Sequence, residues 1–220
     1  YWKRFWKSSI VWYSVKTPAY IPLLFPKFLW RYPDKNGEIF LTFDDGPHPE
    51  ITPWVLNELS KFGAKATFFC VGDNIKKYPE IFEQILAAGH SVGNHTFNHL
   101  NNWQTGTQAY LENIGTAELI MTRFGGSTNL FRPPHGKLKP GTARKLFNKG
   151  YRIVMWDVLS GDFDKAISRE QCLSNICQNS KAGSIVVLHA SEKAWNHLEY
   201  TLPKSLEFLS SKGYCFSAII

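Results

Sequence analysis

The fold of this chain is decided by the stretch Glu38-Ile39-Phe40-Leu41-Thr42-Phe43-Asp44-Asp45-Gly46-Pro47. It is an apolar, β-type run that leads into two adjacent carboxylates, and the Gly-Pro pair ends the strand there. Neighbouring residues of a strand point to opposite faces, so Asp44 and Asp45 can share one site only at the strand end. Alone, the Asp-Asp-Gly-Pro tetrapeptide is more typical of a solvated turn. The residues downstream decide between these interpretations.

Length and composition indicate one well-buried domain. The chain has 220 residues, with 44% apolar and 20% charged side chains, which is ordinary for a globular protein. No apolar run approaches the ~18 residues that a membrane span needs, and no intact signal peptide is visible. The four cysteines (Cys70, Cys172, Cys177 and Cys215) include no Cys-x2-Cys pair, so we expect buried free thiols and no zinc site made of cysteines.

The positive charge is concentrated in residues 1–37, which carry +6 of the net +7 and many aromatic residues. In a helix, one face of the first turns would hold Trp2, Phe5, Trp6, Ile10 and Tyr13. Such a segment suits either contact with a membrane surface or an arm that packs its aromatics onto the domain. Nucleic acid is not the expected partner, because the remaining residues carry no basic stripe. We therefore divide the chain into a basic aromatic N-terminal arm, 1–37, and a main domain, 38–220.

From residue 38 onward, strand-like and helix-like segments alternate. The expected strands are 38–44, 65–71, 91–95, 129–133, 151–158, 183–189 and 214–220. The expected helices are 52–62, 78–88, 107–123, 139–149, 168–179 and 198–211. This order predicts βαβ units in an α/β fold with a parallel sheet, better suited to a small, incomplete barrel than to an open sheet. Reactive groups of such barrels gather at the carboxyl ends of the strands.

Five of the expected strand ends carry titratable or metal-binding residues. His95 and His99 follow the third strand, four residues apart, and a helical turn would bring both imidazoles to one face. Two surface histidines at the start of a helix are the plainer interpretation. With one carboxylate from the first strand, however, they make the ligand count of a catalytic zinc site, which also suits other divalent ions. The second carboxylate of the Asp44-Asp45 pair is then the natural general base.

These residues resemble the polysaccharide deacetylases of the NodB-homology type, carbohydrate esterase family 4. The five motifs of that family match, in order, residues 42–47, 95–99, 132–136, 157–163 and 187–189. The resemblance covers residues 38 to 220 and implies a distorted (β/α)7 barrel that removes acetyl groups from a carbohydrate. It also implies one divalent metal ion, with Zn²⁺ favoured over Co²⁺ or Ni²⁺.

The resemblance also assigns roles to residues. It implies that Asp44 is the catalytic base and His189 the general acid, and that Asp45, His95 and His99 hold the metal. Arg132 would pin Asp44, and Asp162 would orient both Arg132 and His189. The backbone N–H of His135 would stabilise the oxyanion. Substrate contacts are expected from Pro133, His135, Trp156, Phe163 and Val187.

The chain departs from the family pattern in several places. His135 stands where the third motif usually has Tyr, and Phe163 stands where the fourth usually has Trp. Leu159 replaces an Asp of the fourth motif, and Val187 replaces the usual Leu of the fifth. Phe163 and Val187 would line the pocket for the acetyl methyl group. We expect these changes to affect the choice of substrate more than the type of reaction.

Two alternatives remain from the sequence. One is a deformylase or deacetylase of a lipid-linked sugar, which the basic aromatic arm would suit. The other is a carbohydrate-binding relative without turnover, which needs only the metal ligands and would not require the set Asp44, Arg132, Asp162 and His189. The expected partner is an acetylated carbohydrate such as peptidoglycan or chitin, acted on by a monomer in the cell envelope or outside the cytoplasm.

Overall fold

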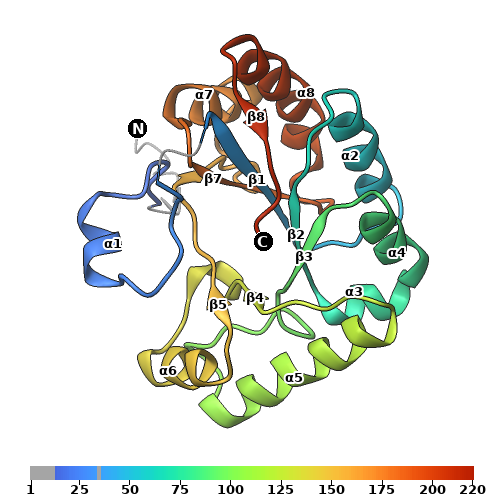
Figure 1. The fold of residues 1–220 in the computed structure, drawn as a ribbon, viewed down its shortest axis with the longest axis vertical. Helices are drawn as coiled ribbons and strands as arrows, with labels where there is room; N and C mark the ends of the chain where they lie inside the picture. The colour runs from blue at the N-terminus through green and yellow to red at the C-terminus, as the bar shows by residue number, and fades with distance from the viewer. Residues whose placement is uncertain (1–12, 34–35) are drawn as a thin grey trace, which may run out of the picture.

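Eight parallel strands form the sheet of this computed structural model, which describes residues 13–33 and 36–220 (Figure 1). They are β1 (Glu38–Asp44), β2 (Thr67–Cys70), β3 (Ser91–Asn94), β4 (Leu130–Phe131), β5 (Arg152–Ile153), β6 (Val158–Leu159), β7 (Ile185–His189) and β8 (Cys215–Phe216). The strand order is β5-β4-β3-β2-β1-β7-β6, and β8 pairs with β1. This parallel half-barrel confirms the predicted α/β fold class.

The helices surround the strands on the outside (Figure 1). They are α1 (Tyr20–Leu24), α2 (Ile51–Ser60), α3 (Gly72–Lys77), α4 (Pro79–Ala87), α5 (Thr107–Arg123), η1 (Pro134–Gly136, a 3₁₀ turn), α6 (Pro140–Asn148), α7 (Arg169–Asn179) and α8 (Trp195–Ser211). The sequence pattern did not predict α1 or α3. Pro79 separates α3 from α4, because the residue before a proline is kept out of the helical region, and Tyr78 has φ −133° and ψ 57°.

Strand β1 lies in the middle of the sheet and is buried on both faces. It pairs with β2 on one side and with β7 on the other, and all of its residues after Glu38 are buried. A strand buried on both faces needs a nearly continuous apolar run, which is what the sequence has here. Phe40 packs inside the barrel with Phe69 and Ile219, and Figure 1 accordingly shows the C-terminus within the ring of strands.

The expected strand 151–158 is wrong as one element, because the chain changes partners along it. Val154 donates its N–H to Phe131 of β4, whereas Asp157 donates its N–H to Ile185 of β7. The segment therefore crosses from one end of the sheet to the other, and β5 and β6 are separate strands that do not pair with each other.

Because β5 and β6 do not pair, the barrel has an opening between these two strands. The described part of the N-terminal arm, residues 13–33, lies along this opening. Leu29 bonds to both Ile153 and Met155 at the β5 side, and Lys16 forms a bridge with Val158 of β6. This segment therefore packs against the barrel as the second interpretation of the arm expects. Of the proposed apolar helical face, Trp2, Phe5, Trp6 and Ile10 lie outside the described residues, whereas Tyr13 is described and is not in a helix. The division at residue 37 stays a prediction.

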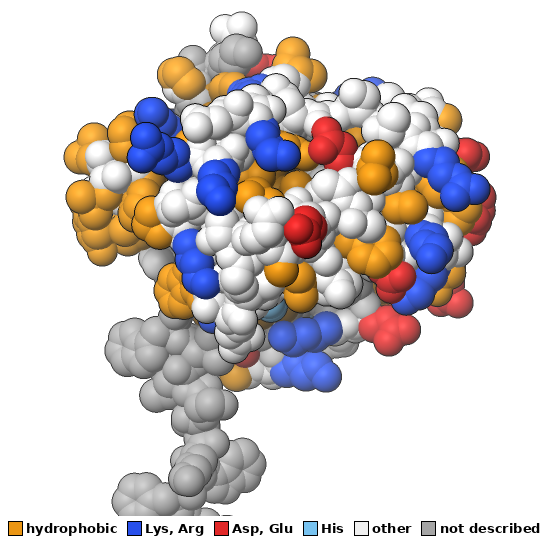
Figure 2. All heavy atoms as spheres, turned by 90° about the horizontal axis from the view of Figure 1, so that it is seen from below, with side chains coloured by type: hydrophobic (Ala, Val, Ile, Leu, Met, Phe, Trp, Pro, Cys, Tyr) orange, Lys and Arg blue, Asp and Glu red, His pale blue; other side chains and the backbone are white. Residues whose placement is uncertain are grey.

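Charged and apolar side chains are unevenly distributed on the face of the molecule in Figure 2. Basic and acidic side chains are interspersed on the face in Figure 2, and apolar side chains gather on the side where Figure 1 places α1. All four cysteines are free, as predicted, but only Cys70 and Cys172 are buried, and Cys215 is exposed. In the described ranges, no helix is long and apolar enough to cross a membrane.

Candidate active site

The two carboxylates of the first motif reach one site because β1 ends between them. Asp44 is the last residue of the strand, and Asp45 has φ 73°, in the left-handed region, so the chain turns between the two side chains. The side-chain amide of Asn74 donates to the backbone oxygen of Asp45 at 2.7 Å and holds this turn. Both carboxylates border one pocket, as the sequence predicted for a strand end.

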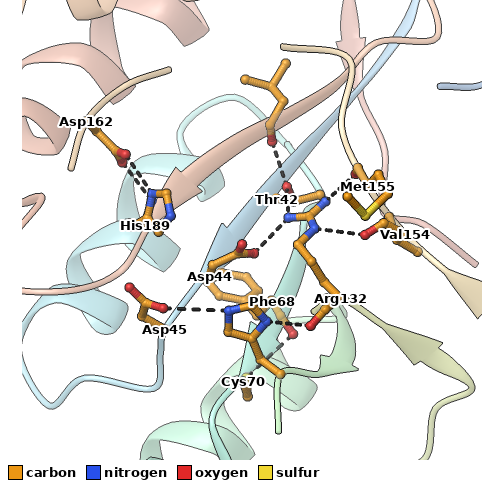
Figure 3. A network of polar contacts seen from close by, with 12 residues as sticks. Thr42, Asp44, Asp45, Phe68, Cys70, Arg132, Val154, Met155, Asp162 and His189 are labelled. Atoms are coloured by element: carbon orange, nitrogen blue, oxygen red, sulfur yellow. Dashed lines mark hydrogen bonds and ion pairs between the residues drawn. The ribbon is translucent and has the colours of Figure 1, made fainter. Parts of the chain in front are cut away.

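Arg132, at the end of β4, is fully buried and bonded to Asp44 (Figure 3). Its Nη1 donates to Asp44 Oδ1 and to Thr42 Oγ1, both at 2.7 Å, while Nε and Nη2 donate to the backbone oxygens of Val154 and Met155. Burial lowers the pKa of Arg132, and the Asp44 carboxylate opposes that effect. Asp44 therefore sits in a fixed orientation, with its Oδ2 left without a hydrogen bond to any described residue.

The guanidinium of Arg132 also packs on the ring of Phe69, and this ring occupies the space beside Gly93. Arg132 Cζ lies 4.1 Å from the centroid of the Phe69 ring. A Cβ atom at Gly93, on the neighbouring strand β3, would lie 2.4 Å from that ring. Any larger residue at position 93 would therefore displace Phe69 and, with it, the support for Arg132.

His95 and His99 converge, but not on a helical turn as expected. They lie in the loop after β3, where Thr96 and His99 have φ 67° and 58°, and their ring centroids are 5.1 Å apart. Asn94 Oδ1 accepts from the Thr96 N–H and stabilises the loop. His95 Nδ1 contacts the backbone oxygen of Arg132 at 2.8 Å, so Nδ1 carries the proton and Nε2 is the free ligand atom.

Asp45, His95 and His99 form a group that fits a metal ion. Their ligand atoms all lie within 4.8 Å of one another. Asp45 Oδ1 is buried and has no hydrogen-bond partner among the described residues, although His99 Nε2 is only 3.2 Å away. Burial lowers the pKa of His95 to about 4 and so keeps it neutral. Burial opposes ionisation of Asp45, but the adjacent histidines hold its pKa below the usual range. A carboxylate and two neutral imidazoles are a suitable donor set for a divalent ion.

Asp162, which is buried, and His189, which is partly exposed, form a second pair on the other side of the pocket. Asp162 accepts from the His189 backbone N–H through Oδ2 and contacts His189 Nδ1 through Oδ1, both at 2.7 Å. Burial lowers the pKa of His189, but the charge and hydrogen bond of Asp162 outweigh it and raise that pKa to about 9. Within the described residues Asp162 makes no hydrogen bond to Arg132, so the expectation that it orients Arg132 has no direct contact behind it and stays a prediction. Arg132 contacts Asp44, and Asp162 contacts His189.

The pocket has a volume of about 650 Å³ and includes all five residues expected to contact substrate. These are Pro133, His135, Trp156, Phe163 and Val187. His135 has φ 59°, and its ring lies 4.7 Å from that of His99, but it is not in the ligand group. Its backbone N–H donates to no described residue.

Sequence reasoning missed several residues of this site. The pocket is also lined by Tyr13, Gly136, Lys137, Leu159 and Lys193. Thr42 could have been found, because it lies two residues before Asp44 and so on the same face of β1. Tyr13 could not, because its position in the pocket depends on how the N-terminal segment packs.

Comparison with known proteins places the chain in a family. The sequence profile of the polysaccharide deacetylase family matches residues 31–154. A peptidoglycan-N-acetylglucosamine deacetylase of Bacillus cereus is 35% identical over 188 residues, which cover 84% of this chain and 67% of the relative. A chitooligosaccharide deacetylase of Azorhizobium caulinodans is 35% identical over 161 residues, which cover 72% of this chain and 76% of the relative.

Solved structures agree with this result. A crystal structure of a peptidoglycan N-acetylglucosamine deacetylase in complex with a benzamide compound has a TM-score of 0.85 at 31% identity, covering 92% of this chain and 95% of that one. A family 4 carbohydrate esterase from Streptomyces lividans in complex with acetate has a TM-score of 0.75 at 30% identity, covering 84% and 94%. Together with the five ordered motifs, these matches show that the chain belongs to the polysaccharide deacetylase family of carbohydrate-deacetylating hydrolases.

Proposed function

We propose that this protein hydrolyses the N-acetyl group of N-acetylglucosamine units in a cell-wall polymer of the peptidoglycan type. The observation that carries the proposal is the arrangement of one pocket, in which the ligand group (Asp45, His95 and His99) lies with a carboxylate held by Arg132 and an imidazole held by Asp162. Hydrolysis of an amide needs an electrophile, a base and an acid at one place, and these three parts supply them.

The ligand group would hold one divalent ion, for which Zn²⁺ is our first choice and Co²⁺ or Ni²⁺ are alternatives. When bound, the ion would supply Lewis acidity at the scissile carbonyl. The buried, unpartnered Oδ1 of Asp45 supports this assignment, because a buried carboxylate oxygen without a partner is costly in a folded protein. The bond from His95 Nδ1 to the Arg132 backbone supports it too, since such bonds orient metal-binding histidines.

Asp44 would be the general base. Its Oδ1 is held by Arg132, so Oδ2 is the oxygen left to take a proton from the attacking water. The contact with Arg132 also fixes the position of the Asp44 carboxylate. The guanidinium donates to four acceptors, two on β1 and two on the segment after β5, and cannot move without breaking these bonds.

His189 would be the general acid. Its pKa of about 9 means that the imidazole is protonated at neutral pH and can protonate the departing amine. The free backbone N–H of His135 would donate to the oxyanion, a role that leaves the side chain at this position free to vary. Phe163 and Val187 line the pocket and would contact the acetyl methyl group.

The rim of the pocket favours an acidic polymer. Lys137 and Lys193 both line it, and within the described residues neither has an acidic partner. Lys137 lies over the ring of Trp103, which is 62% exposed and offers a flat apolar face to a sugar ring. Peptidoglycan carries carboxylates beside its N-acetylglucosamine units, whereas chitin is neutral, so these lysines favour peptidoglycan.

The test is an acetate-release assay on four substrates with added Zn²⁺ or Co²⁺: peptidoglycan fragments, chito-oligosaccharides, acetylated xylan and an N-formylated lipid-linked aminosugar, with formate measured for the last. We expect the highest kcat/KM on peptidoglycan fragments. Asp44→Asn is the matched control and should release no acetate. Release of formate alone would instead support the deformylase alternative. Metal binding without any turnover would support the alternative of a binding protein, against which the intact Asp44–Arg132 and Asp162–His189 pairs argue.

Action on such a polymer implies a location in the cell envelope or outside the cytoplasm. We further propose that residues 1–37 contact an anionic membrane surface. Residues 13–33 contain no acidic residue, and α1 and the residue after it expose Tyr20, Leu23, Leu24 and Phe25. Sedimentation with phosphatidylglycerol vesicles should be lost in Leu23→Glu/Leu24→Glu. Sedimentation velocity should show a monomer.

A further inference from the structure

One wall of the pocket comes from outside all five motifs. Tyr13 lines the pocket, although it lies far upstream of residue 31, where the family profile begins to match. It belongs to the N-terminal segment that fills the opening between β5 and β6. Tyr13 therefore lies outside the range that the family profile matches.

Tyr13 packs on the loop that carries the acid pair. Its ring centroid lies 5.4 Å from that of Phe163, which in turn lies 5.3 Å from the ring of His189. The Tyr13 hydroxyl donates to Asp164 Oδ2 at 3.0 Å. A chain of three rings thus runs from the N-terminal segment through Phe163 to His189, and Phe163 is held between the other two rings.

The loop itself is shaped to receive Tyr13. Gly161 has φ +80°, and a Cβ atom at this position would lie 2.8 Å from the Tyr13 hydroxyl. Only glycine adopts this conformation easily and also leaves room for the hydroxyl. Burial raises the pKa of Tyr13, and Asp164 raises it further, so the hydroxyl keeps its proton and stays a donor.

The segment after Tyr13 is fixed to the barrel by several bonds. The N–H of Leu159 donates to Val15 at 2.8 Å, and the N–H of Thr17 donates to Asp157 at 2.9 Å. Lys16 Nζ lies 2.6 Å from Asp157 Oδ2, which also accepts from Ser184. These bonds fix the position of Tyr13 relative to the loop that carries Phe163.

We propose that Tyr13 determines which acyl group the enzyme accepts, by fixing Phe163 as a wall of the acyl pocket. This inference rests on the proposed deacetylase function. A ring held between two others cannot yield to an acyl group larger than acetyl. Without the Tyr13 ring, Phe163 can move back, and the pocket admits one more methylene. The expected consequence is a change in selectivity and not only a loss of rate.

The experiment compares kcat/KM for peptidoglycan fragments whose glucosamine amino groups carry either acetyl or propionyl. Tyr13→Ala should raise the propionyl-to-acetyl ratio by roughly 10-fold or more, since one methylene in a fitted pocket changes specificity by about 10- to 200-fold. Tyr13→Phe keeps the ring and loses only the bond to Asp164, so its ratio should stay within about twofold of the parent. Tyr20→Ala, at an exposed position of the same segment, is the control and should match the parent.

Two outcomes separate the inference from the function on which it rests. If the parent hydrolyses neither substrate, the proposed function fails. If the parent is active but Tyr13→Ala lowers both rates equally and leaves the ratio unchanged, Tyr13 is only structural and the inference is overturned. Should Tyr13→Ala fail to fold, Tyr13→Leu removes the aromatic ring with less loss of packing and is judged by the same ratio.

Discussion

Replacing Asp44 with Asn should destabilise the metal-free protein and leave its metal site intact. Asp44 and Arg132 are both buried, at 4% and 0% exposure, with 2.7 Å between Oδ1 and Nη1. Removing one member of a buried ion pair leaves the other charge uncompensated and costs about 3–5 kcal/mol. Asn keeps one acceptor oxygen, and Thr42 and two backbone oxygens still accept from Arg132. We therefore expect the lower end of that range, about 3 kcal/mol.

The matched variant is Asp45→Asn, which changes the neighbouring carboxylate. Asp45 Oδ1 has no hydrogen-bond partner in the described structure, so this change should cost the metal-free protein little. For a chain of this size, 1 kcal/mol corresponds to a shift in Tm of about 2–4 °C. Asp44→Asn should therefore melt about 6–12 °C below the parent, and Asp45→Asn close to it.

The assay is thermal unfolding, followed by circular dichroism, first after chelation and then with Zn²⁺ added. At 100 times its Kd, a ligand stabilises the folded state by about 2.7 kcal/mol. The parent and Asp44→Asn should both gain several degrees, and Asp45→Asn should not. The reasoning is refuted if metal-free Asp44→Asn melts with the parent, or if Asp45→Asn keeps the full gain from metal.

Three other predictions follow from the site. Chelation should abolish activity and Zn²⁺ or Co²⁺ should restore it; full activity after exhaustive chelation, checked by metal analysis, would contradict the proposed ligand group. Asp162→Asn should shift the basic limb of the pH–rate profile down, because Asp162 contributes most to raising the His189 pKa to about 9; an unchanged limb would remove His189 as the acid. In the metal-free parent, the raised pKa stabilises the fold fully below about pH 6.5, and this contribution is lost as the pH rises through 9, so the fall in Tm over that window should be smaller in Asp162→Asn. His135→Ala should keep its metal affinity and His135→Tyr its kcat, as a backbone role requires; a 10-fold loss of affinity in an isothermal titration would make His135 a ligand.

The residues at strand ends were the part of the site that the sequence could predict. Parallel strands deliver their carboxyl ends to one rim, so Asp44, His95, Arg132 and His189 had to lie near one another once the strands were found. Their pairing was harder to predict. The sequence predicted that Asp162 would orient both Arg132 and His189. In the structure Arg132 donates to Asp44, and Asp162 contacts His189 on the other side of the pocket.

Elements that depend on tertiary contacts were not predictable in the same way. The segment 151–158 has the composition of one strand, yet it changes partners between Val154 and Asp157. The turn that brings His95 to His99 uses two non-glycine residues with positive φ, which no local preference would suggest. In each case the conformation is stabilised by groups far away in the sequence, such as Asn113, whose Oδ1 accepts from the N–H of Phe97.

Whether a site residue lies at a strand end or on a loop also explains which parts of the site can vary. Arg132 holds Asp44, the proposed base, through its side chain and His95, a proposed metal ligand, through its backbone oxygen, so one strand end positions two parts of the proposed machinery. A change there would disturb both, which leaves little freedom. Tyr13, His135 and Phe163 instead reach the pocket from a segment and loops that contact the chemistry only at its edge. Substrate choice can therefore change at these three positions while the strand ends, and the reaction they perform, stay the same.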